Sequence, residues 1–112
     1  MYYGFATALA QYGRGLCPKP IPEFDDISYM TIALDHLRYR TGIKTIALQT
    51  VYLRPDAPPD TRFEVATSGA KVVTIVSILS SRSFKHIPTQ AAVKHVSQLI
   101  GGKQALWWTS TL

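Results

Sequence analysis

The sequence predicts a small α/β sandwich in which helices cover both faces of a four-stranded mixed sheet. Two segments, Ile43–Leu53 and Lys71–Leu79, are rich in Ile, Val, Thr and Leu on both alternating faces, which is typical of strands buried on each side. One helical pattern precedes these strands and a second one follows them. We therefore expect a single domain over residues 1–112, with a short aromatic C-terminal tail.

The N-terminal residues predict a strand and then a turn. Tyr2–Leu9 is rich in aromatic and small residues, which favours a first strand. The glycines of Tyr12–Gly15 favour a turn with positive φ over a phosphate-binding loop, because the rest of a nucleotide-binding fingerprint is missing. Prolines at positions 18, 20 and 22 then hold the chain extended before the first helix.

The first helix is expected over Asp26–Thr41. Asp25 or Asp26 is suited to the N-cap, and Gly42 is suited to the C′ position that follows the helix. Apolar residues recur at helical spacing and predict one buried stripe, formed by Ile27, Met30, Leu34 and Leu37.

Three strands are expected between the two helices. Ile43–Leu53 is followed by a loop with prolines at 55, 58 and 59. The strand cannot continue through this loop, because proline has no N–H to donate within a sheet. Arg62–Thr67 alternates in polarity, and the turn at 68–69 leads back into Lys71–Leu79 as an antiparallel hairpin. The interior positions of these strands are expected to be Ile46, Leu48, Val73 and Ile75.

The second helix is expected over Pro88–Ile100, with a pair of glycines at its end. Its buried stripe is expected to comprise Ala92, Val93, Val96, Leu99 and Ile100. Trp107 and Trp108 follow in the tail, and two adjacent indoles do not both fit into so small a core. They are therefore expected either to pack over a sheet edge or to dock on a partner.

The predicted order of elements, β-α-β-β-β-α, is that of a minimal thioredoxin-like domain. The alternative is the ferredoxin-like order β-α-β-β-α-β. It requires Ala105–Thr109 to form a final strand and the middle strands to merge.

Charge is distributed unevenly along the chain. There are 12 Lys and Arg against 7 Asp and Glu, which gives a net charge of +5, and no acidic residue follows Glu64. This balance suits either an ordinary basic soluble protein or one that binds a polyanion, because neutralising phosphates releases their counterions. No apolar run approaches the ~20 residues of a membrane helix, so no transmembrane segment is predicted.

No catalytic or metal-binding pattern is evident. The single cysteine, Cys17, excludes an internal disulfide and a site built on several thiolates. A redox thioredoxin needs Cys-x-x-Cys where this chain has Glu23–Ser28. Histidines 36, 86 and 95 fall on separate elements and are interpreted as surface residues, and Asp25 with Asp26 as a helix cap rather than an acid–base pair. We expect no enzymatic activity, metal or cofactor.

Several short motifs occur in a characteristic order. They are Ala8-Leu9 before Gly13-Arg14-Gly15, the strand that ends in Arg54-Pro55, Pro59 before Ser68-Gly69, Gly101-Gly102, and Gln104 with Trp107 or Trp108. In this order the chain resembles the thioredoxin-like family shared by mitochondrial ribosomal proteins and a small accessory subunit of respiratory complex I. It is most similar to the members found in the large ribosomal subunit. It differs in having prolines and acids before the first helix, where the family usually has Gly or Ser.

The resemblance implies a non-catalytic component of the mitochondrial large ribosomal subunit, located in the mitochondrial matrix. Its implied partners are rRNA and neighbouring ribosomal proteins, with no membrane and no small-molecule substrate. Cations at turns and helix ends can reach phosphates, so the expected RNA-binding residues are Arg14, Lys19, Arg38, Arg40, Arg82, Lys85 and Lys103. Trp107 and Trp108 are expected to lie on a neighbouring protein or an RNA surface.

Two other functional classes stay open. An accessory subunit of complex I would contact mainly protein, and its basic surface would meet no phosphate. A small hotdog-fold thioesterase is the third class, because Tyr52–Pro55 resembles a turn that these enzymes often carry after a strand. Nothing before the first helix matches their His-Gly-Gly motif or an equivalent acid.

Overall fold

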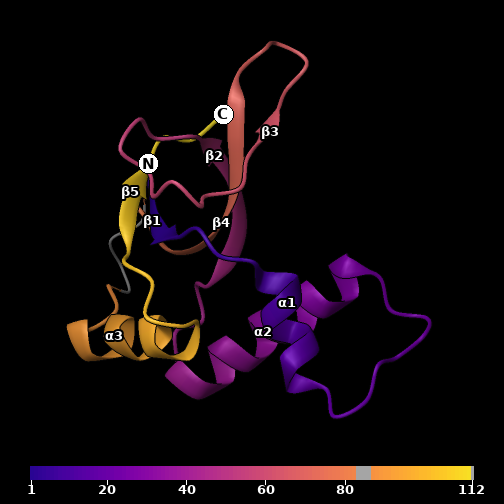
Figure 1. Ribbon diagram of the computed structural model, residues 1–112. Coiled ribbons are helices and arrows are strands. Elements are labelled where there is room, and N and C mark those ends of the chain that lie inside the picture. The colour runs from indigo at the N-terminus through magenta and orange to yellow at the C-terminus, as the bar shows by residue number, and fades with distance from the viewer. Residues whose placement is uncertain (83–86, 112) are drawn as a thin grey trace.

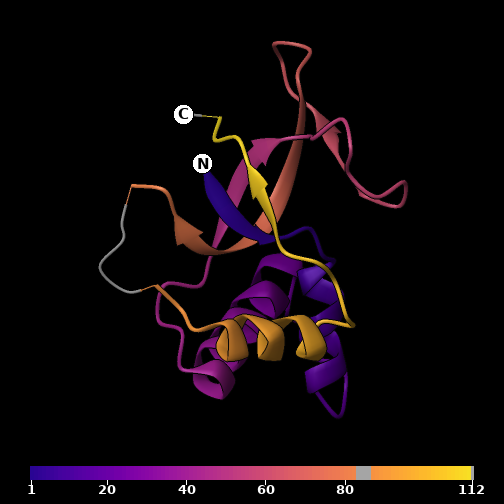
Figure 2. The ribbon, with the colours of Figure 1, turned by 90° about the vertical axis from the view of Figure 1, so that its left-hand side faces the viewer.

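The computed structural model, which describes residues 1–82 and 87–111, contains two layers. The sheet is formed by β1 (Tyr2–Phe5), β2 (Ala47–Tyr52), β3 (Glu64–Val65), β4 (Lys71–Ser80) and β5 (Leu106–Trp108). The helices are α1 (Leu9–Leu16), α2 (Asp26–Thr41) and α3 (Gln90–Leu99). Figure 1 and Figure 2 show all three on one side of the sheet. The predicted α/β class is confirmed. The prediction that helices cover both faces of the sheet is wrong.

The sheet has the strand order β2-β4-β1-β5, and every strand pair described is antiparallel. The expected mixed sheet is therefore wrong, and so is the order β-α-β-β-β-α, because β5 adds a final strand beside β1. The two-residue β3 pairs with the beginning of β4 and confirms the predicted hairpin. With β3 and α1 set aside, the connectivity is the β-α-β-β-α-β of the ferredoxin-like alternative.

Apolar side chains fill both faces of the sheet. Under the helices the buried cluster comprises Phe5, Leu9, Ala33, Leu37, Ile43, Ile46, Val76, Ile78, Val96 and Ile100. The opposite face carries a smaller cluster of Val51, Val73, Ile75 and Trp108. Alternate residues of β4 enter the two clusters, which is why this strand has an apolar pattern on both sides. Three of the expected interior residues are buried, and Leu48 is half-buried.

The smaller cluster is covered because the sheet curls until the segment after β5 reaches β2. An isolated β-bridge joins Val51 to Ser110. Hydrogen bonds flank this bridge, from the Tyr52 N–H to the Thr109 carbonyl (3.0 Å) and from the Thr111 hydroxyl to the Thr50 carbonyl (3.2 Å). The expected tail is therefore a strand and a closing segment, which brings two edges of the sheet together as in a small barrel.

The two tryptophans separate because successive side chains of a strand point to opposite faces. Trp108 is 1% exposed, and its indole N–H donates to the Gly4 carbonyl at 3.3 Å. Trp107 is 36% exposed, and its ring centroid lies 5.1 Å from that of Tyr3. The prediction that Trp108 lies on a partner is therefore wrong, whereas Trp107 is accessible.

The segment expected to form the first turn is instead helix α1. Neither Gly13 nor Gly15 has a positive φ. Gly13 is buried where α1 crosses α2, and a Cβ built on it would lie 2.0 Å from the Tyr29 carbonyl oxygen. Gly15 faces open space. The first of the two glycines therefore permits close packing of the helices, for which the sequence offered no local signal.

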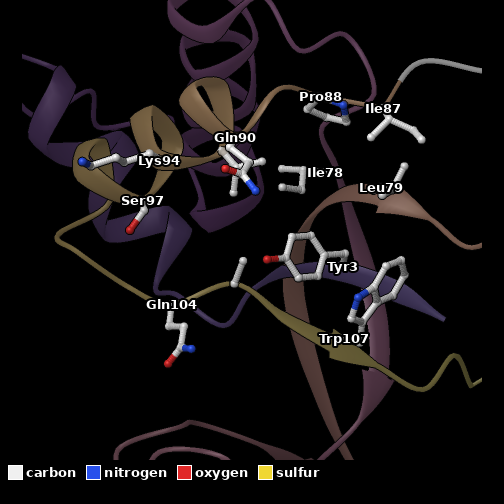
Figure 3. A pocket seen from close by; sticks show the side chains of 12 residues that line it. Tyr3, Ile78, Leu79, Ile87, Pro88, Gln90, Lys94, Ser97, Gln104 and Trp107 are labelled. Atoms are coloured by element: carbon white, nitrogen blue, oxygen red, sulfur yellow. The ribbon is translucent and has the colours of Figure 1, made fainter. Parts of the chain in front are cut away.

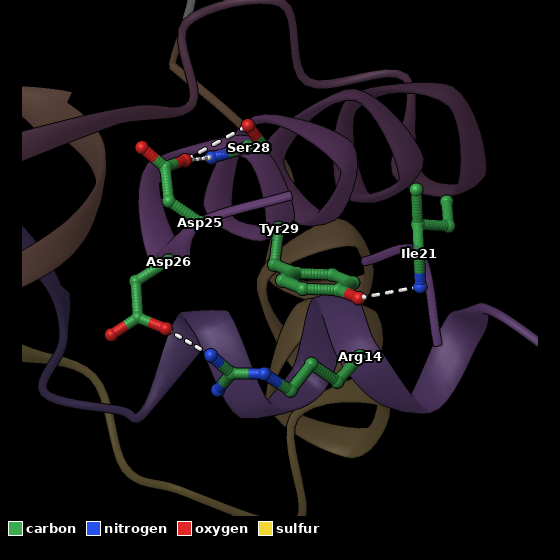
Figure 4. Close-up of polar contacts among 6 residues, drawn as sticks. All are labelled: Arg14, Ile21, Asp25, Asp26, Ser28 and Tyr29. Atoms are coloured by element: carbon green, nitrogen blue, oxygen red, sulfur yellow. Dashed lines mark hydrogen bonds and ion pairs between the residues drawn. The ribbon is translucent and has the colours of Figure 1, made fainter. Parts of the chain in front are cut away.

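Polar contacts hold α1 against the beginning of α2, as Figure 4 shows. Arg14 forms an ion pair with Asp26, and its guanidinium carbon lies 4.9 Å from the centroid of the Tyr29 ring. Asp25 caps α2 by accepting from the N–H and the hydroxyl of Ser28, both at 2.9 Å. These hydrogen bonds hold the pKa of the Asp25 carboxyl below its usual value.

The two predicted helices are confirmed, and the bounds of α2 were predicted more accurately than those of α3. α2 has the predicted bounds, but its buried residues are Tyr29, Ala33 and Leu37, and Ile27 is 68% exposed. Leu37 belongs to the predicted stripe, and Met30 and Leu34 of that stripe are half-buried against the same core, so only Ile27 departs from the prediction. α3 begins two residues later than predicted, with Thr89 as its N-cap, and buries Val96. No helix in the described ranges combines the length and apolarity that crossing a membrane requires.

Arg54 joins the proline-containing loop to β5. Its guanidinium donates to both carboxylate oxygens of Asp56, at 2.8 and 2.7 Å, and also to the Trp107 carbonyl. The hydrogen bonds from Arg54 hold the pKa of the Asp56 carboxyl below its usual value. Because this pKa is depressed in the folded state, the ion pair stabilises the fold above the unfolded value of about 3.9, and this stabilisation disappears as pH falls through the folded value.

We expect Arg54→Gln to raise the pKa of Asp56 towards its ordinary value, because the charged donor is removed. An NMR titration of the Asp56 carboxyl carbon measures this directly. Arg62→Gln is the control, since Arg62 is a neighbouring exposed arginine that does not contact Asp56. An Asp56 midpoint that stays depressed in Arg54→Gln would contradict the assignment.

Candidate nucleic-acid interface

The cations that were expected to bind RNA differ in whether they have acidic partners. Three form ion pairs within the chain: Arg14 with Asp26, Arg38 with Asp35, and Lys103 with Asp60. Three have no acidic partner in the part of the chain that the structure describes: Lys19, Arg40 and Arg82. Lys85 lies outside the described residues.

Arg38 connects two elements of the fold. Its Nε donates to the Ile46 carbonyl at 2.8 Å, and one terminal nitrogen lies 3.2 Å from the Asp35 carboxylate. The guanidinium therefore holds the chain that leads from α2 into β2. A side chain with two internal partners is a poor candidate for phosphate binding, because a phosphate would compete with both of them.

The segment between α2 and β2 lies beside the end of β4. The antiparallel register places Ala47 opposite Ser77, and the Thr45 hydroxyl donates to the Ile78 carbonyl at 2.9 Å. Figure 2 shows the C-terminal end of β4 at its left-hand side, with the beginning of α3 and then the C-terminal end of α2 below it. Residues far apart in sequence are thus gathered on one side of the molecule.

This side carries three exposed cations, Arg40, Lys44 and Arg82, which we call the basic end. None of them has an acidic partner within the described ranges. Lys44 was not selected from the sequence, although it lies just after a helix end, as the selected cations do. Lys19 is apart from the basic end, in the loop between α1 and α2 at the lower right of Figure 2.

The acidic residues are concentrated elsewhere. One group surrounds the beginning of α2, and another lies in the loop after β2 and in β3: Glu23, Asp25 and Asp26 in the first, and Asp56, Asp60 and Glu64 in the second. The seventh, Asp35, is paired with Arg38. Because the opposite charges are separated in space, the basic end keeps a positive potential.

A groove of about 450 Å³ lies between α3 and the strands β1, β4 and β5 (Figure 3). The sheet contributes Tyr3, Ile78, Leu79 and Trp107 to its walls. The α3 side contributes Ile87, Pro88, Gln90, Val93, Lys94 and Ser97, and the link to β5 contributes Gln104 and Ala105. Among these residues one is cationic and none is acidic. Lys94 and the groove were not predicted, because a lysine in mid-helix has no distinguishing sequence signal.

No protein-family model, curated protein or solved structure matches the chain. In residues 1–82 and 87–111, no three His, Cys, Asp or Glu side chains are grouped so that they could hold a metal ion. The basic end and the groove are therefore the features from which a function can be argued.

Proposed function

We propose that this protein is a non-catalytic RNA-binding component of the mitochondrial large ribosomal subunit. The observation that carries the RNA-binding part is the basic end, where Arg40, Lys44 and Arg82 lack acidic partners among the described residues. Exposed cations of this kind bind phosphates and release counterions, which favours association with RNA. Such contacts position a protein on RNA without reading its sequence, as a structural subunit requires.

The ribosomal and mitochondrial parts of the proposal are supported by the order of the sequence motifs. The antiparallel sheet differs from the expected thioredoxin-like arrangement, so topology adds no support to that family. In this proposal rRNA lies against the basic end, and neighbouring ribosomal proteins contact other parts of the surface.

Salt-dependent RNA binding tests the basic end. We expect the double variant Arg40→Gln, Arg82→Gln to bind single-stranded RNA more weakly, because two cations that bind phosphate are removed. The slope of log K against log salt concentration should become shallower by about 1.4, which is ~0.7 for each phosphate that is no longer neutralised. Fluorescence anisotropy with a labelled oligoribonucleotide measures both quantities.

The matched control is the double variant Arg62→Gln, Lys71→Gln. It removes the same net charge from exposed cations that lie away from the basic end and have no acidic partner in the described part of the chain. Its salt slope should equal that of the unaltered protein. Equal reductions of affinity in the two double variants would show that charge alone matters and would exclude the basic end as a defined interface.

Co-sedimentation tests the ribosomal assignment. In mitochondrial extracts, the protein should sediment with large ribosomal subunits and be released by RNase. Arg40→Glu with Arg82→Glu should reduce the fraction that sediments. Co-sedimentation that survives RNase and is unchanged in the variant would contradict the proposal and favour a protein-only interface, as expected for an accessory subunit of complex I.

A further inference from the structure

We infer that the groove between α3 and strands β1 and β5 binds single-stranded RNA, with an unpaired base stacked on Trp107 at one end and a phosphate further along the same strand on Lys94 at the other end (Figure 3). This inference rests on the proposed RNA-binding function and deepens it, because it assigns the form of RNA that is bound. The basic end alone would bind any phosphate backbone, whereas a base-stacking groove requires an unpaired strand.

Trp107 is an accessible aromatic surface on a paired strand. It lies opposite Tyr3 in the β1–β5 pairing, and its carbonyl accepts a hydrogen bond from Arg54. The Tyr3 and Trp107 rings are inclined at 43° with their centroids 5.1 Å apart, and Figure 3 shows both on the sheet side of the groove. An indole fixed on a strand loses little freedom when a base stacks on it, and every base has a face that can stack.

Polar groups in the groove suit the edge of a base. Figure 3 shows the Tyr3 hydroxyl and the Gln90 amide directed into the space between the sheet and α3. Neither has a hydrogen-bond partner among the residues that the structure describes, whereas the Ser97 hydroxyl already donates to the Lys103 carbonyl. An amide supplies a donor and an acceptor together, which is the pattern that base edges present.

The charge of the groove favours a nucleotide over an apolar peptide. Lys94 is exposed on α3, and no acidic residue is among the described residues that line the groove. Leu79, which lines the groove, is three residues from Arg82 in the chain, so a strand bound at Arg82 can continue into the groove. A volume of about 450 Å³ lies within the ~300–1,000 Å³ typical of small-molecule sites.

The test compares three probes of similar charge by fluorescence anisotropy and competition: single-stranded oligouridylate, an RNA duplex of half its length, which carries a similar number of phosphates, and inorganic polyphosphate. We expect Trp107→Ala to weaken oligouridylate binding about tenfold or more, and to leave duplex and polyphosphate binding unchanged, because only unpaired bases stack. Trp107→Phe should keep most of the affinity. Phe63→Ala is the control, since Phe63 is an exposed aromatic residue outside the groove.

A second variant, Lys94→Gln, keeps the test independent of any effect that the Trp107→Ala substitution has on folding. Lys94→Gln changes an exposed helical side chain, and it should reduce the salt slope for oligouridylate by about 0.7. If the basic-end variants lose RNA binding but Trp107→Ala and Lys94→Gln do not, the groove inference is overturned and the proposed function stands. If the unaltered protein has no salt-dependent affinity for any of the three probes, the proposed function fails as well. Preferential binding of an uncharged apolar peptide in the groove would also overturn the inference.

Discussion

Replacing Trp108 with alanine is expected to lower the free energy of unfolding by about 3–5 kcal/mol. The indole is 1% exposed and fills the space between Val51, Val73 and Ile75 on the curled face of the sheet. Its removal leaves a cavity there and also removes the donor to the Gly4 carbonyl. Small domains have about 5–15 kcal/mol of total stability, so this change brings the protein close to unfolding at ordinary temperature.

Urea denaturation followed by circular dichroism measures this cost. Trp107→Ala is the matched control, because it removes the same group from a neighbouring position whose side chain is 36% exposed. It should cost clearly less than Trp108→Ala. Trp108→Phe should fall between the two, because it keeps an aromatic ring but has no N–H to donate. Equal costs for the two alanine variants would contradict the inward position of Trp108.

Gly13→Ala is expected to destabilise the fold by about 1–3 kcal/mol, the usual cost of forcing extra volume into a packed contact. A Cβ at this position would lie 2.0 Å from the carbonyl oxygen and 2.7 Å from the carbonyl carbon of Tyr29. Both atoms belong to the backbone of α2 and cannot rotate away. Helix α1 must therefore move off α2, which also separates Arg14 from Asp26.

Gly15→Ala provides the control for Gly13→Ala, since both glycines lie in α1 and the same methyl group is added. Nothing lies within 4 Å of a Cβ at Gly15, so this change should stabilise the helix by about 0.5–1 kcal/mol. Thermal unfolding of the two variants should therefore shift in opposite directions. Two shifts of the same sign would exclude the close crossing of α1 and α2.

The elements that were predicted correctly have local causes. α2 begins and ends where predicted because Asp25 accepts from the Ser28 N–H, and because Gly42 adopts the left-handed conformation that ends a helix. The β3–β4 hairpin was predicted because its turn contains a glycine, and Gly69 has a φ of 87°. Each of these signals lies within a few residues of the structure that it specifies.

The elements that were missed depend on distant contacts. A Gly-x-Gly sequence is compatible with a turn or a helix, and the backbone of α2 selects the helix by packing against Gly13. Tyr29 is buried on α2 beside the predicted stripe, where Gly13 and Arg14 of α1 lie against it, and the sequence did not predict α1. β5 was expected only in the ferredoxin-like alternative, because it is three residues long and exists as a strand through its pairing with β1, more than 100 positions away in the chain.

Some features of the candidate interface could likewise be predicted from the sequence, and others depend on the tertiary structure. The excess of positive charge and the absence of acidic residues after Glu64 follow from composition and order alone, so they could be read without a structure. Which cations are available depends instead on how the chain folds. Lys103 is paired with Asp60, 43 positions away, whereas Arg40, in the last turn of α2, and Arg82, just after β4, have no acidic partner among the described residues. An ion pair acts over a few ångströms of space, and distances in space are set by how the sheet and helices pack.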